Sequence, residues 1–292
     1  MENVLKGIDK LISEPMSRHT TFRVGGPARC FFMPSNVDEI ISIIKYSLLN
    51  NQKYMILGNG SNVLFSDEGY DGNIIQIYSN MSRIKVEDEI LYAEAGALLG
   101  RVANVAKEHS LTGMEFAAGI PGTIGGAMVM NAGAYGGEMK DIVEYVDVLE
   151  ADFKVRRYTC DEMEFSYRHS IIDKDKIVIG AALKLANGSQ ESIVNRMNEL
   201  KEARVSKQPL EYPSAGSTFK RPEGYFAGKL IQDAGLKGYS VGGAKVSEKH
   251  CGFVINYDHA SAKDILDLIE DVKRIVYEET GVSLEPEVRI IK

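Results

Sequence analysis

The stretch GIPGTIGGAMVMNAGAYGG, residues 119–137, is the part of the chain that fits an ordinary scaffold least well. Seven of its nineteen residues are glycine. Glycine tolerates positive φ angles and lets another backbone or a ligand approach closely, but it loses more conformational entropy on folding than any other residue. A run this rich in glycine therefore predicts a loop that is shaped around something.

The residues of this run alone leave two interpretations open. One is a glycine-rich turn beside a tightly packed strand, since glycines gather at bulges and close crossings. The other is a cradle for an anion, because Thr123 and Asn131 can hydrogen-bond and the run contains no lysine or arginine. Such a cradle would bind the anion through backbone N–H groups rather than through charged side chains.

Length and charge limit the class of protein. The 292 residues are enough for two or three domains of about 100 to 200 residues each. With 34 basic and 41 acidic residues the net charge is −7, and no basic block is present, so we expect no nucleic-acid or membrane partner. The N-terminus has no long apolar segment, which favours a cytoplasmic protein. We also expect a monomer.

The cysteines and histidines favour structural roles. Cys30, Cys160 and Cys251 are odd in number and far apart, which fits a reducing cytosol and predicts neither a disulfide framework nor paired zinc ligands. His250 and the other histidines lack the spacing of metal ligands, so we expect no metal site.

Apolar spacing predicts the elements that precede the glycine run. Residues 1–17 are predicted to form a short helix that ends at Pro15. Residues 38–50, capped by Ser35 or Asn36, and residues 98–109 are predicted to form amphipathic helices. Short strands are expected at residues 30–34, 54–57, 74–77, 84–86 and 90–96. Two sheet regions separated by helices indicate an α+β fold.

The rest of the chain continues the α+β pattern. Residues 143–149 and 154–158 are predicted to form a hairpin, and residues 190–204 a polar helix that links to a last domain. Residues 210–216, with two prolines and a glycine, should not be helical. Further elements are expected as strands at 177–183, 244–246, 253–256 and 288–291, a short helix within 226–238 ended by glycine, and a helix from Ser261, its cap, to about Tyr277.

A second glycine cluster follows the predicted strand at residues 54–57. There the sequence Gly58-Asn59-Gly60-Ser61-Asn62 presents backbone N–H groups and small polar side chains at one point. This is a plausible phosphate site, although the cluster lacks the third glycine of a dinucleotide fingerprint and the Gly-Lys-Ser/Thr of a P-loop. Neither standard nucleotide motif occurs anywhere in the sequence.

Six stretches, taken together and in order, resemble one family along almost the whole chain. They are residues 20–28, 57–65, 119–135, 167–170, 216–222 and 284–291. Each is weak by itself, but their common order resembles the UDP-N-acetylenolpyruvoylglucosamine reductases, flavoenzymes that make UDP-N-acetylmuramate for bacterial peptidoglycan. The resemblance favours the cradle over the simple turn.

The resemblance implies an FAD-binding domain of the vanillyl-alcohol-oxidase type, followed by a smaller α+β substrate-binding domain. The expected boundaries are residues 1–188 for the FAD domain, with lobes of about 1–70 and 71–188, residues 189–206 for the linker helix, and residues 207–292 for the substrate domain. The residues implied to bind FAD are Thr21, Arg23, Gly58, Asn59, Gly60, Ser61, Asn62, Gly119, Ile120, Pro121, Gly122, Thr123, Gly125, Gly126, Ala127, Asn131 and Gly133.

The implied reaction divides the work between cofactor and protein. NADPH would reduce FAD, and flavin N5 would deliver a hydride to the enolpyruvyl methylene carbon of the UDP-sugar substrate. Negative charge then moves to the adjacent carbon and its carboxylate, so the protein must stabilise that charge and supply one proton. In the family NADPH and substrate take turns in one cleft, which explains the missing dinucleotide fingerprint.

Three residues match the family's catalytic positions. Ser217 would donate the proton, while Arg168 and Glu287 would stabilise the enolate at the carboxylate. Guanidinium suits this role because it binds carboxylate in a bidentate fork. Glu287 helps if it is protonated or if it orients a donor, since an ionised carboxylate would repel the developing charge. Without the resemblance, Ser217 would be interpreted as a turn residue and Glu287 as a surface acid.

Other residues match substrate positions of the family. They are Tyr167, Arg204, Lys207, Lys220, Lys229 and Asn256, each of which could otherwise be a solvated side chain. Two departures from the family pattern matter. The short spacing from Arg168 to Ser217 resembles the branch without the inserted substrate-capping loop, and Arg221 stands before Pro222 where the family usually has asparagine.

Two other functions are alternatives to the reductase. An oxidase of the same flavin fold would usually tether FAD through histidine or cysteine, and no candidate for the tether stands out in the glycine segments. A catalytically silent nucleotide-sugar binding protein is the rival from another class. Ser217 and Arg168 in their expected contexts argue against it, and purified protein without yellow colour would favour it.

Overall fold

The computed structural model describes residues 5–292, and the chain divides into two compact units. Unit 1 comprises Met1–Leu11, Cys30–Asn59 and Gly72–Ala203, and unit 2 comprises Ile12–Arg29, Gly60–Asp71 and Arg204–Lys292. The units differ from the predicted domain boundaries, because two early segments group with the C-terminal part. The predicted domains are defined by the ligand that each binds, whereas the two units are defined by their compactness. The predicted boundaries therefore stay a prediction.

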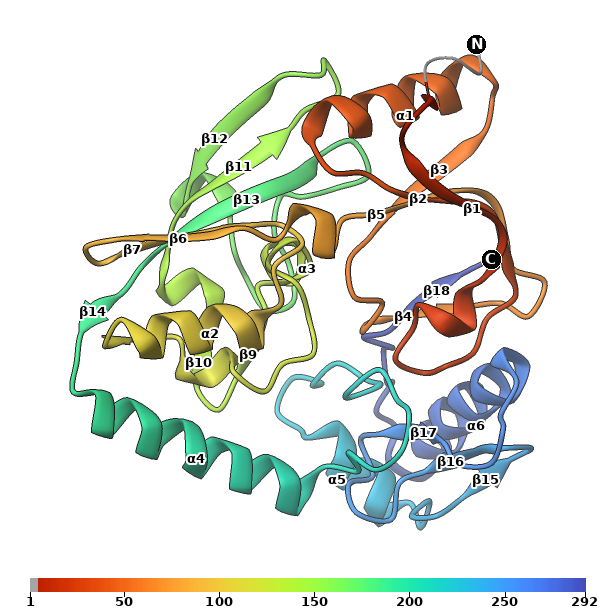
Figure 1. The fold of residues 1–292 in the computed structure, drawn as a ribbon. Coiled ribbons are helices and arrows are strands. Elements are labelled where there is room, and N and C mark those ends of the chain that lie inside the picture. Colours follow the sequence, from red (N-terminus) through yellow and green to blue (C-terminus); the bar gives the residue numbers. More distant parts are fainter. Residues whose placement is uncertain (1–4) are drawn as a thin grey trace. The chain divides into compact units, whose positions relative to one another are not determined.

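Unit 1 is built on a five-stranded antiparallel sheet (Figure 1). Its strands, in spatial order, are β12 (Val155–Thr159), β11 (Val143–Leu149), β13 (Ile177–Lys184), β7 (Ile90–Glu94) and β6 (Ile84–Glu87). Seven of the eight residues of β13 are buried, as a central strand that is covered on both faces requires. The helices α2 (Leu99–Glu108) and α3 (Ile124–Met130) pack against this sheet. The predicted hairpin, strands and first part of the α+β fold are confirmed.

A smaller sheet has the strand order β1-β2-β5-β3. Its strands are β1 (Asp9–Pro15), β2 (Pro27–Met33), β5 (Tyr70–Gln76) and β3 (Lys53–Leu57), and α1 (Val37–Leu49) packs on β3. The Asn36 side chain accepts the Glu39 N–H (3.0 Å), so the predicted cap is confirmed.

The helix predicted for residues 1–17 is wrong over its described part. Residues 9–15 form β1 instead, while residues 1–4 lie outside the described part of the chain. The apolar spacing was misleading because Leu11 and Ile12 are 39% and 62% exposed and form no buried helical face. Pairing at the edge of a sheet overrides the local pattern here.

The glycine run is also more ordered than a loop. Residues 124–130 form α3, whose N-cap Thr123 accepts the Gly126 N–H through its side chain (3.4 Å). The helix ends at Asn131, which has a left-handed φ of 41°. Threonine before the helix and asparagine after it are ordinary boundary residues, so the expected loop is corrected to a capped helix between turns.

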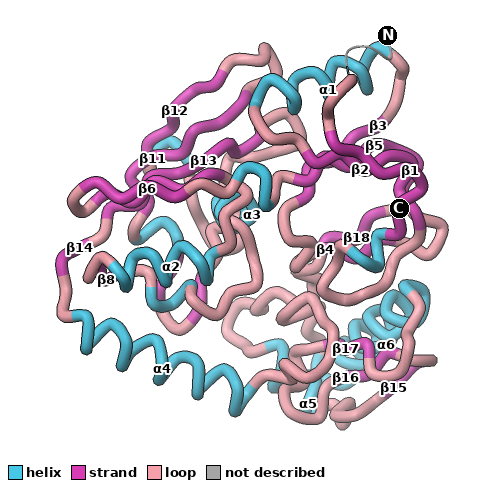
Figure 2. Tube along the Cα trace, viewed as in Figure 1, coloured by secondary structure: helices cyan, strands magenta, loops and turns pink. Residues whose placement is uncertain are grey.

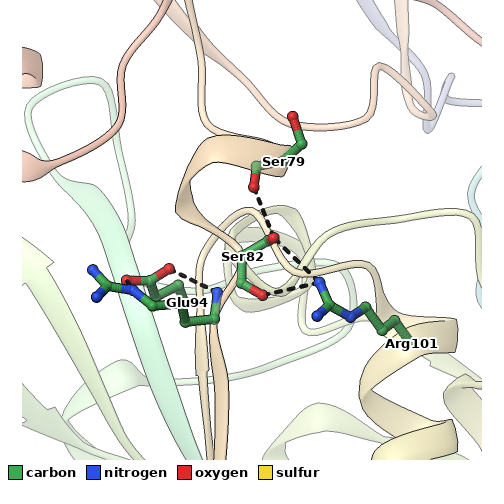
Figure 3. Close-up of polar contacts among 5 residues, drawn as sticks. Ser79, Ser82, Glu94 and Arg101 are labelled. Atoms are coloured by element: carbon green, nitrogen blue, oxygen red, sulfur yellow. Dashed lines mark hydrogen bonds and ion pairs between the residues drawn. The ribbon is translucent and has the colours of Figure 1, made fainter.

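Polar contacts hold the segment before α2. The carbonyls of Ala95 and Ala97 in this segment accept N–H groups from the start of α3. Arg101 Nη1 donates to the carbonyl and hydroxyl oxygens of Ser82 (3.3 Å each), and Ser82 Oγ donates to the Ser79 carbonyl (2.8 Å; Figure 3). Glu94 accepts the Arg83 N–H (2.7 Å). These bonds fix both sides of the tight turn at Gly96, where a Cβ atom would lie 2.0 Å from the Tyr78 carbonyl oxygen.

Unit 2 contains a three-stranded antiparallel sheet covered by one long helix. The sheet has the order β15 (Ser240–Val241), β16 (Ala244–Val246), β17 (Val254–Asn256), and α6 (Ala262–Thr280) packs on all three strands. Ser261 and Asp264 form a reciprocal capping box, so the predicted cap of α6 is confirmed. Asp67 adds to it by accepting the N–H groups of Ala262 (2.8 Å) and Lys263 (2.9 Å).

Two further connections organise unit 2. The last strand, β18 (Arg289–Ile291), pairs in parallel with β4 (Val63–Phe65), and α5 (Ala227–Asp233) packs on α6. The long helix α4 (Gln190–Lys207) is followed by a loop rather than a helix, as Figure 2 shows and as expected for residues 210–216.

Shorter elements complete the described chain. They are the strands β8 (Leu111–Thr112), β9 (Gly133–Ala134), β10 (Gly137–Glu138) and β14 (Ala186–Asn187) and the 3₁₀ turns η2 (Met16–Arg18), η3 (Ser79–Met81), η4 (Glu115–Ala117), η5 (Met139–Asp141) and η6 (Asp161–Met163). Among residues 5–292, no helix has the length and apolar character needed to span a membrane.

Candidate active site

The first two residues of the first glycine segment, Gly58 and Asn59, meet the second glycine segment in unit 1. The Asn59 side-chain amide donates to the Pro121 carbonyl oxygen (2.8 Å), which ties the first segment to the second. A Cβ atom at Gly58 would lie 2.5 Å from Thr123 Oγ1, so only glycine permits this approach. Gly58, Asn59, Pro121 and Thr123 were all predicted to bind FAD, and the structure brings them together.

Backbone N–H groups of the first segment are available to a ligand. Within the described residues 5–292, the N–H groups of Asn59, Gly60 and Ser61 donate no hydrogen bond. Gly60 is itself fixed by the Thr21 N–H, which donates to its carbonyl oxygen (3.1 Å), and by a left-handed φ of 63°. Thr21 Oγ1 is buried and finds no partner in the described part of the chain.

The second segment is less open than the sequence predicts. The N–H groups of Ile124 and Gly125 donate to the carbonyl oxygens of Ala97 (2.9 Å) and Ala95 (2.8 Å), so the scaffold uses two of the first donors of α3. A Cβ atom at Gly126, by contrast, would meet only Thr123 Oγ1, at 3.7 Å. That space next to the helix is free of described atoms and is available to a ligand.

These observations test whether the residues fit a diphosphate. In unit 2, free N–H donors at Gly60 and Ser61 and an orphaned buried hydroxyl at Thr21 suit a group that is rich in acceptors. These residues therefore fit a phosphate group of the kind that FAD carries. Of the other predicted residues of the second segment, Ile120 and Ala127 donate their N–H groups to Ala117 and Thr123, and Gly122 accepts the Leu99 N–H.

Arg168 stands in a tight turn that α3 holds in place. Its φ is 57°, a left-handed conformation that costs a non-glycine residue free energy. Ser166 and His169 bridge across the turn, and the Ser170 hydroxyl donates to the carbonyl of Val129 in α3 (3.0 Å). The guanidinium reaches the Gly133 carbonyl (3.5 Å) and lies 5.1 Å from the Tyr167 ring centroid.

Asn131 connects α3 with that turn. Its side chain is fully buried and donates to Glu138 Oε2 (2.6 Å) and to the Ser166 carbonyl (3.2 Å), while its oxygen accepts the Lys140 N–H (3.0 Å). Asn131 was predicted among the FAD-binding residues. These bonds give it a structural task whatever it does with the cofactor, because they join the helix at the second glycine segment to the turn that carries Arg168.

Ser217 and Glu287 lie on adjoining segments in unit 2. Phe219 and Pro286 form an antiparallel bridge, and the Glu287 N–H donates to the Thr218 carbonyl oxygen (2.8 Å). Ser217 is exposed, and its hydroxyl makes no hydrogen bond within residues 5–292. The structure thus brings together two predicted catalytic residues that are distant in sequence.

Asn62 links this pair to the first glycine segment. Its amide donates to the Glu287 carbonyl oxygen (3.2 Å), and its own carbonyl accepts the Arg289 N–H (3.0 Å) at the start of the β4–β18 pairing. A residue predicted to lie at the cofactor is therefore bonded directly to a residue predicted to act on the substrate, within the same unit.

Several of the predicted substrate residues have protein partners. Lys220 pairs with Glu285 and Lys229 with Asp233, both on the surface. Tyr167 is exposed, and Arg204 and Lys207 lie in the last turn of α4. Arg221, which replaces the family's asparagine, stacks on Phe226 at 4.0 Å and donates to the Tyr225 carbonyl (3.3 Å), so it serves the local turn.

Asn256 also carries structural bonds. It donates to the Phe22 carbonyl (3.1 Å) and accepts the Ala260 N–H (2.8 Å). It lines a cavity of about 470 Å³ in unit 2, together with Arg23, which was predicted at the cofactor. The other lining residues are Tyr212, Pro213, Tyr257, Asp258, His259 and Ala260.

Some residues that build the site were missed by the sequence analysis. Thr218 is wholly buried and joins Ser217 to Glu287 through its backbone. Gly252, whose carbonyl accepts the Thr218 N–H, donates its own N–H to His250 Nδ1 (3.1 Å), and burial lowers the pKa of this imidazole. The sequence offers one signal for Thr218, which is a second hydroxyl residue directly after Ser217. No cluster of three or more potential metal ligands occurs among the residues that the structure describes.

Comparison with protein families assigns both parts of the chain. Residues 28–159 match the FAD binding domain, and residues 208–291 match the C-terminal domain of UDP-N-acetylenolpyruvoylglucosamine reductase. Wild-type Phl p 4.0202, a glucose dehydrogenase, shares the fold with a TM-score of 0.50 at 16% identity, covering 64% of this chain and 44% of that one. The two matched domains thus define an FAD-dependent oxidoreductase.

Whole-chain relatives narrow this class. The UDP-N-acetylenolpyruvoylglucosamine reductase of Caldanaerobacter subterraneus is 52% identical over 100% of this chain and 96% of its own, and that of Agathobacter rectalis is 51% identical over 96% and 93%. The crystal structure of the Thermus caldophilus enzyme superposes with a TM-score of 0.83 at 35% identity, covering 98% and 99%. The chain belongs to the UDP-N-acetylenolpyruvoylglucosamine reductase family, which serves peptidoglycan precursor synthesis and uses FAD and NADPH.

Proposed function

We propose that the chain catalyses the NADPH-dependent reduction of UDP-N-acetylglucosamine enolpyruvate to UDP-N-acetylmuramate. The observation that supports this best is the backbone pairing of the Ser217 segment with the Glu287 segment, because it brings a residue with a hydroxyl donor and a residue with a carboxyl group onto adjoining segments. The Asn62 amide bonds to the Glu287 carbonyl oxygen beside them. When bound, FAD supplies hydride chemistry, taking a hydride from NADPH and giving one to the enolpyruvyl methylene carbon.

The glycine segments hold the cofactor in this proposal. Residues 58–62 and 119–127 contact the FAD diphosphate, with Thr21, Arg23, Asn131 and Gly133 nearby. The free N–H groups of Asn59, Gly60 and Ser61 would supply the donors for the phosphate oxygens, and Thr21 Oγ1 would gain the partner that it lacks among the described residues.

Ser217 supplies the proton that completes the reduction. Hydride addition leaves a carbanion next to the substrate carboxylate, and the Ser217 hydroxyl protonates that carbon. Because a serine hydroxyl is a weak acid, it must be held within hydrogen-bond reach of the carbon and its oxyanion must be supported. Lys220 or Lys229 gives that support. Their ion pairs with Glu285 and Asp233 are exposed, so exchanging the partner costs little free energy.

Arg168 and Glu287 manage the charge at the substrate carboxylate. The Arg168 guanidinium binds the carboxylate in a fork, which stabilises the enolate that forms during hydride addition. Glu287 acts there as a protonated acid or by orienting a donor. The UDP-sugar is bound by Tyr167, Arg204, Lys207 and Asn256. We further propose that the enzyme works as a monomer in the cytoplasm.

The decisive experiment separates the two half-reactions. Protein reduced with one equivalent of NADPH is mixed anaerobically with UDP-N-acetylglucosamine enolpyruvate, and we expect the absorbance of oxidised flavin to return as UDP-N-acetylmuramate forms. Ser217→Ala should keep the reduction by NADPH and slow the reoxidation by about 100-fold or more. Equal slowing of both steps would contradict the role of Ser217, and flavin that stays reduced after the substrate is added would contradict the function.

Arg168→Lys provides the matched test of the carboxylate fork. Lysine keeps the positive charge but cannot form two parallel hydrogen bonds, so reoxidation by substrate should also slow severely. Arg196→Lys, on the exposed face of α4, is the control and should leave both half-reactions unchanged. Near-normal reoxidation in Arg168→Lys would remove the fork from the mechanism.

A further inference from the structure

Thr218 joins the two segments that carry Ser217 and Glu287. It is wholly buried, and its hydrogen bonds run in three directions within unit 2. Its N–H donates to the Gly252 carbonyl (2.8 Å), its carbonyl accepts the Glu287 N–H (2.8 Å), and its Oγ1 accepts the Val254 N–H (2.9 Å). One residue thus contacts the turn before β17, the first residue of β17 and the Glu287 segment.

The neighbouring residues provide little of this restraint. Gly216, on the other side of Ser217, has a φ of 76°, and a Cβ atom there would meet nothing within 4 Å. Ser217 is exposed, and its hydroxyl has no hydrogen bond within the described residues. The position of the serine is therefore determined mainly from its C-terminal side, where Thr218 is bonded.

The Thr218 hydroxyl has a specific task in this arrangement. Val254 is buried, and its N–H would lose its acceptor if Oγ1 were removed. A buried N–H without an acceptor is costly, so the segment would shift to satisfy it. That shift would pass directly to the Thr218 carbonyl, which receives the Glu287 N–H, and to the peptide bond shared with Ser217.

We propose that Thr218 is a positioning residue for substrate reduction, which sets the Ser217 hydroxyl and Glu287 relative to each other through its own buried hydroxyl. The inference rests on the proposed function. It concerns only the step in which the substrate is protonated, because reduction of the cofactor by NADPH does not use these two residues.

The test uses Thr218→Val and Thr218→Ser in the FAD-loaded enzyme. Valine keeps the shape and removes the hydroxyl, whereas serine keeps the hydroxyl. We expect Thr218→Val to slow reoxidation by substrate about tenfold to 100-fold while reduction by NADPH stays within about twofold, since misplacement by about 1 Å can cost that much. Thr218→Ser should restore reoxidation. In Thr218→Val, residues 284–291 should also exchange amide hydrogens faster than in Thr218→Ser.

Controls keep the outcomes distinct. Ser247→Ala removes another buried hydroxyl of unit 2, which accepts the Lys249 (3.1 Å) and His250 (3.3 Å) N–H groups, and should not separate the half-reactions. If Thr218→Val slows both half-reactions equally, or behaves like Thr218→Ser, the inference is wrong. If Ser217→Ala itself leaves reoxidation unchanged, the proposed function fails instead.

Discussion

Gly58 and Gly126 lack a side chain for different physical reasons. At Gly58 the protein itself fills the space, since a Cβ atom would lie 2.5 Å from Thr123 Oγ1. At Gly126 the nearest described atom would be that same oxygen at 3.7 Å, an ordinary contact. The first glycine is therefore required by the fold, whereas the fold leaves the space at the second open, as the proposed FAD site needs.

Alanine substitution separates these two reasons. Gly58→Ala should lower the melting temperature of the FAD-free protein, because Thr123 would have to move. Gly126→Ala should leave that temperature unchanged or raise it slightly, since alanine favours a helix by about 0.5–1 kcal/mol over glycine. Its affinity for FAD should nevertheless fall about tenfold or more, measured by flavin fluorescence. Wild-type affinity in Gly126→Ala would mean that the space is not used by the cofactor.

His250 gives a prediction for the dependence of stability on pH. Burial holds the pKa of the folded imidazole below that of the unfolded chain, which is about 6.5. The unfolded state therefore binds more protons as the pH falls, so this contribution to stability is complete above about pH 6.5 and is lost as the pH falls toward the folded pKa. Protonation at Nδ1 would also remove the acceptor of the Gly252 N–H.

The variant His250→Asn tests this contribution. Asparagine keeps an acceptor near Nδ1 but does not titrate, so the fall in unfolding free energy between pH 7 and pH 5 should be smaller than in the wild type. His109→Asn, at the exposed C-terminal end of α2, is the control. Urea titrations at several pH values measure the difference, and parallel curves for wild type and His250→Asn would contradict the assignment.

At the scale of elements, α3 connects the proposed cofactor and substrate residues of unit 1. Its N-terminus follows the turn at Pro121, and its C-terminus holds the Arg168 turn through Asn131 and Val129. The glycine density predicts a loop here because it outweighs the boundary residues Thr123 and Asn131. Close approaches do shape the segment, but the segment forms a short helix.

Asn131→Asp should disrupt this connection. The change removes the donors to the Ser166 carbonyl and Glu138, and it sets a second carboxylate about 2.6 Å from the first in a buried position. We expect a loss of about 3 kcal/mol in unfolding free energy. Asn104→Asp, exposed on α2 next to Lys107, should change it by less than about 0.5 kcal/mol. Equal losses in the two variants would mean that Asn131 does not hold the turn.

At the scale of the whole molecule, long-range pairing is what the sequence could not reveal. Periodicity located α1, α2, α6 and the central strands, because these patterns are local. The parallel pairing of β18 with β4 and the bond from Asp67 to α6 join residues that are far apart in sequence, and no local pattern encodes them. The same limit applies to the site, since only the family resemblance predicts catalytic roles for Ser217, Arg168 and Glu287.

Removal of FAD tests the site as a property of the whole protein. A ligand that binds only the folded state stabilises it by RT ln(1 + [L]/Kd), about 2.7 kcal/mol at 100 times Kd. Protein stripped of FAD should therefore melt several degrees lower, and added FAD should restore the temperature in proportion to the logarithm of its concentration. FMN, which has the same ring but no diphosphate, should restore little, because the free N–H groups of Asn59, Gly60 and Ser61 then lack their acceptors. Gly126→Ala should show the same melting temperature without FAD and a smaller rise with it. An equal rise with FMN and FAD would show that the ring alone provides the binding energy and that the glycine segments do not hold the diphosphate.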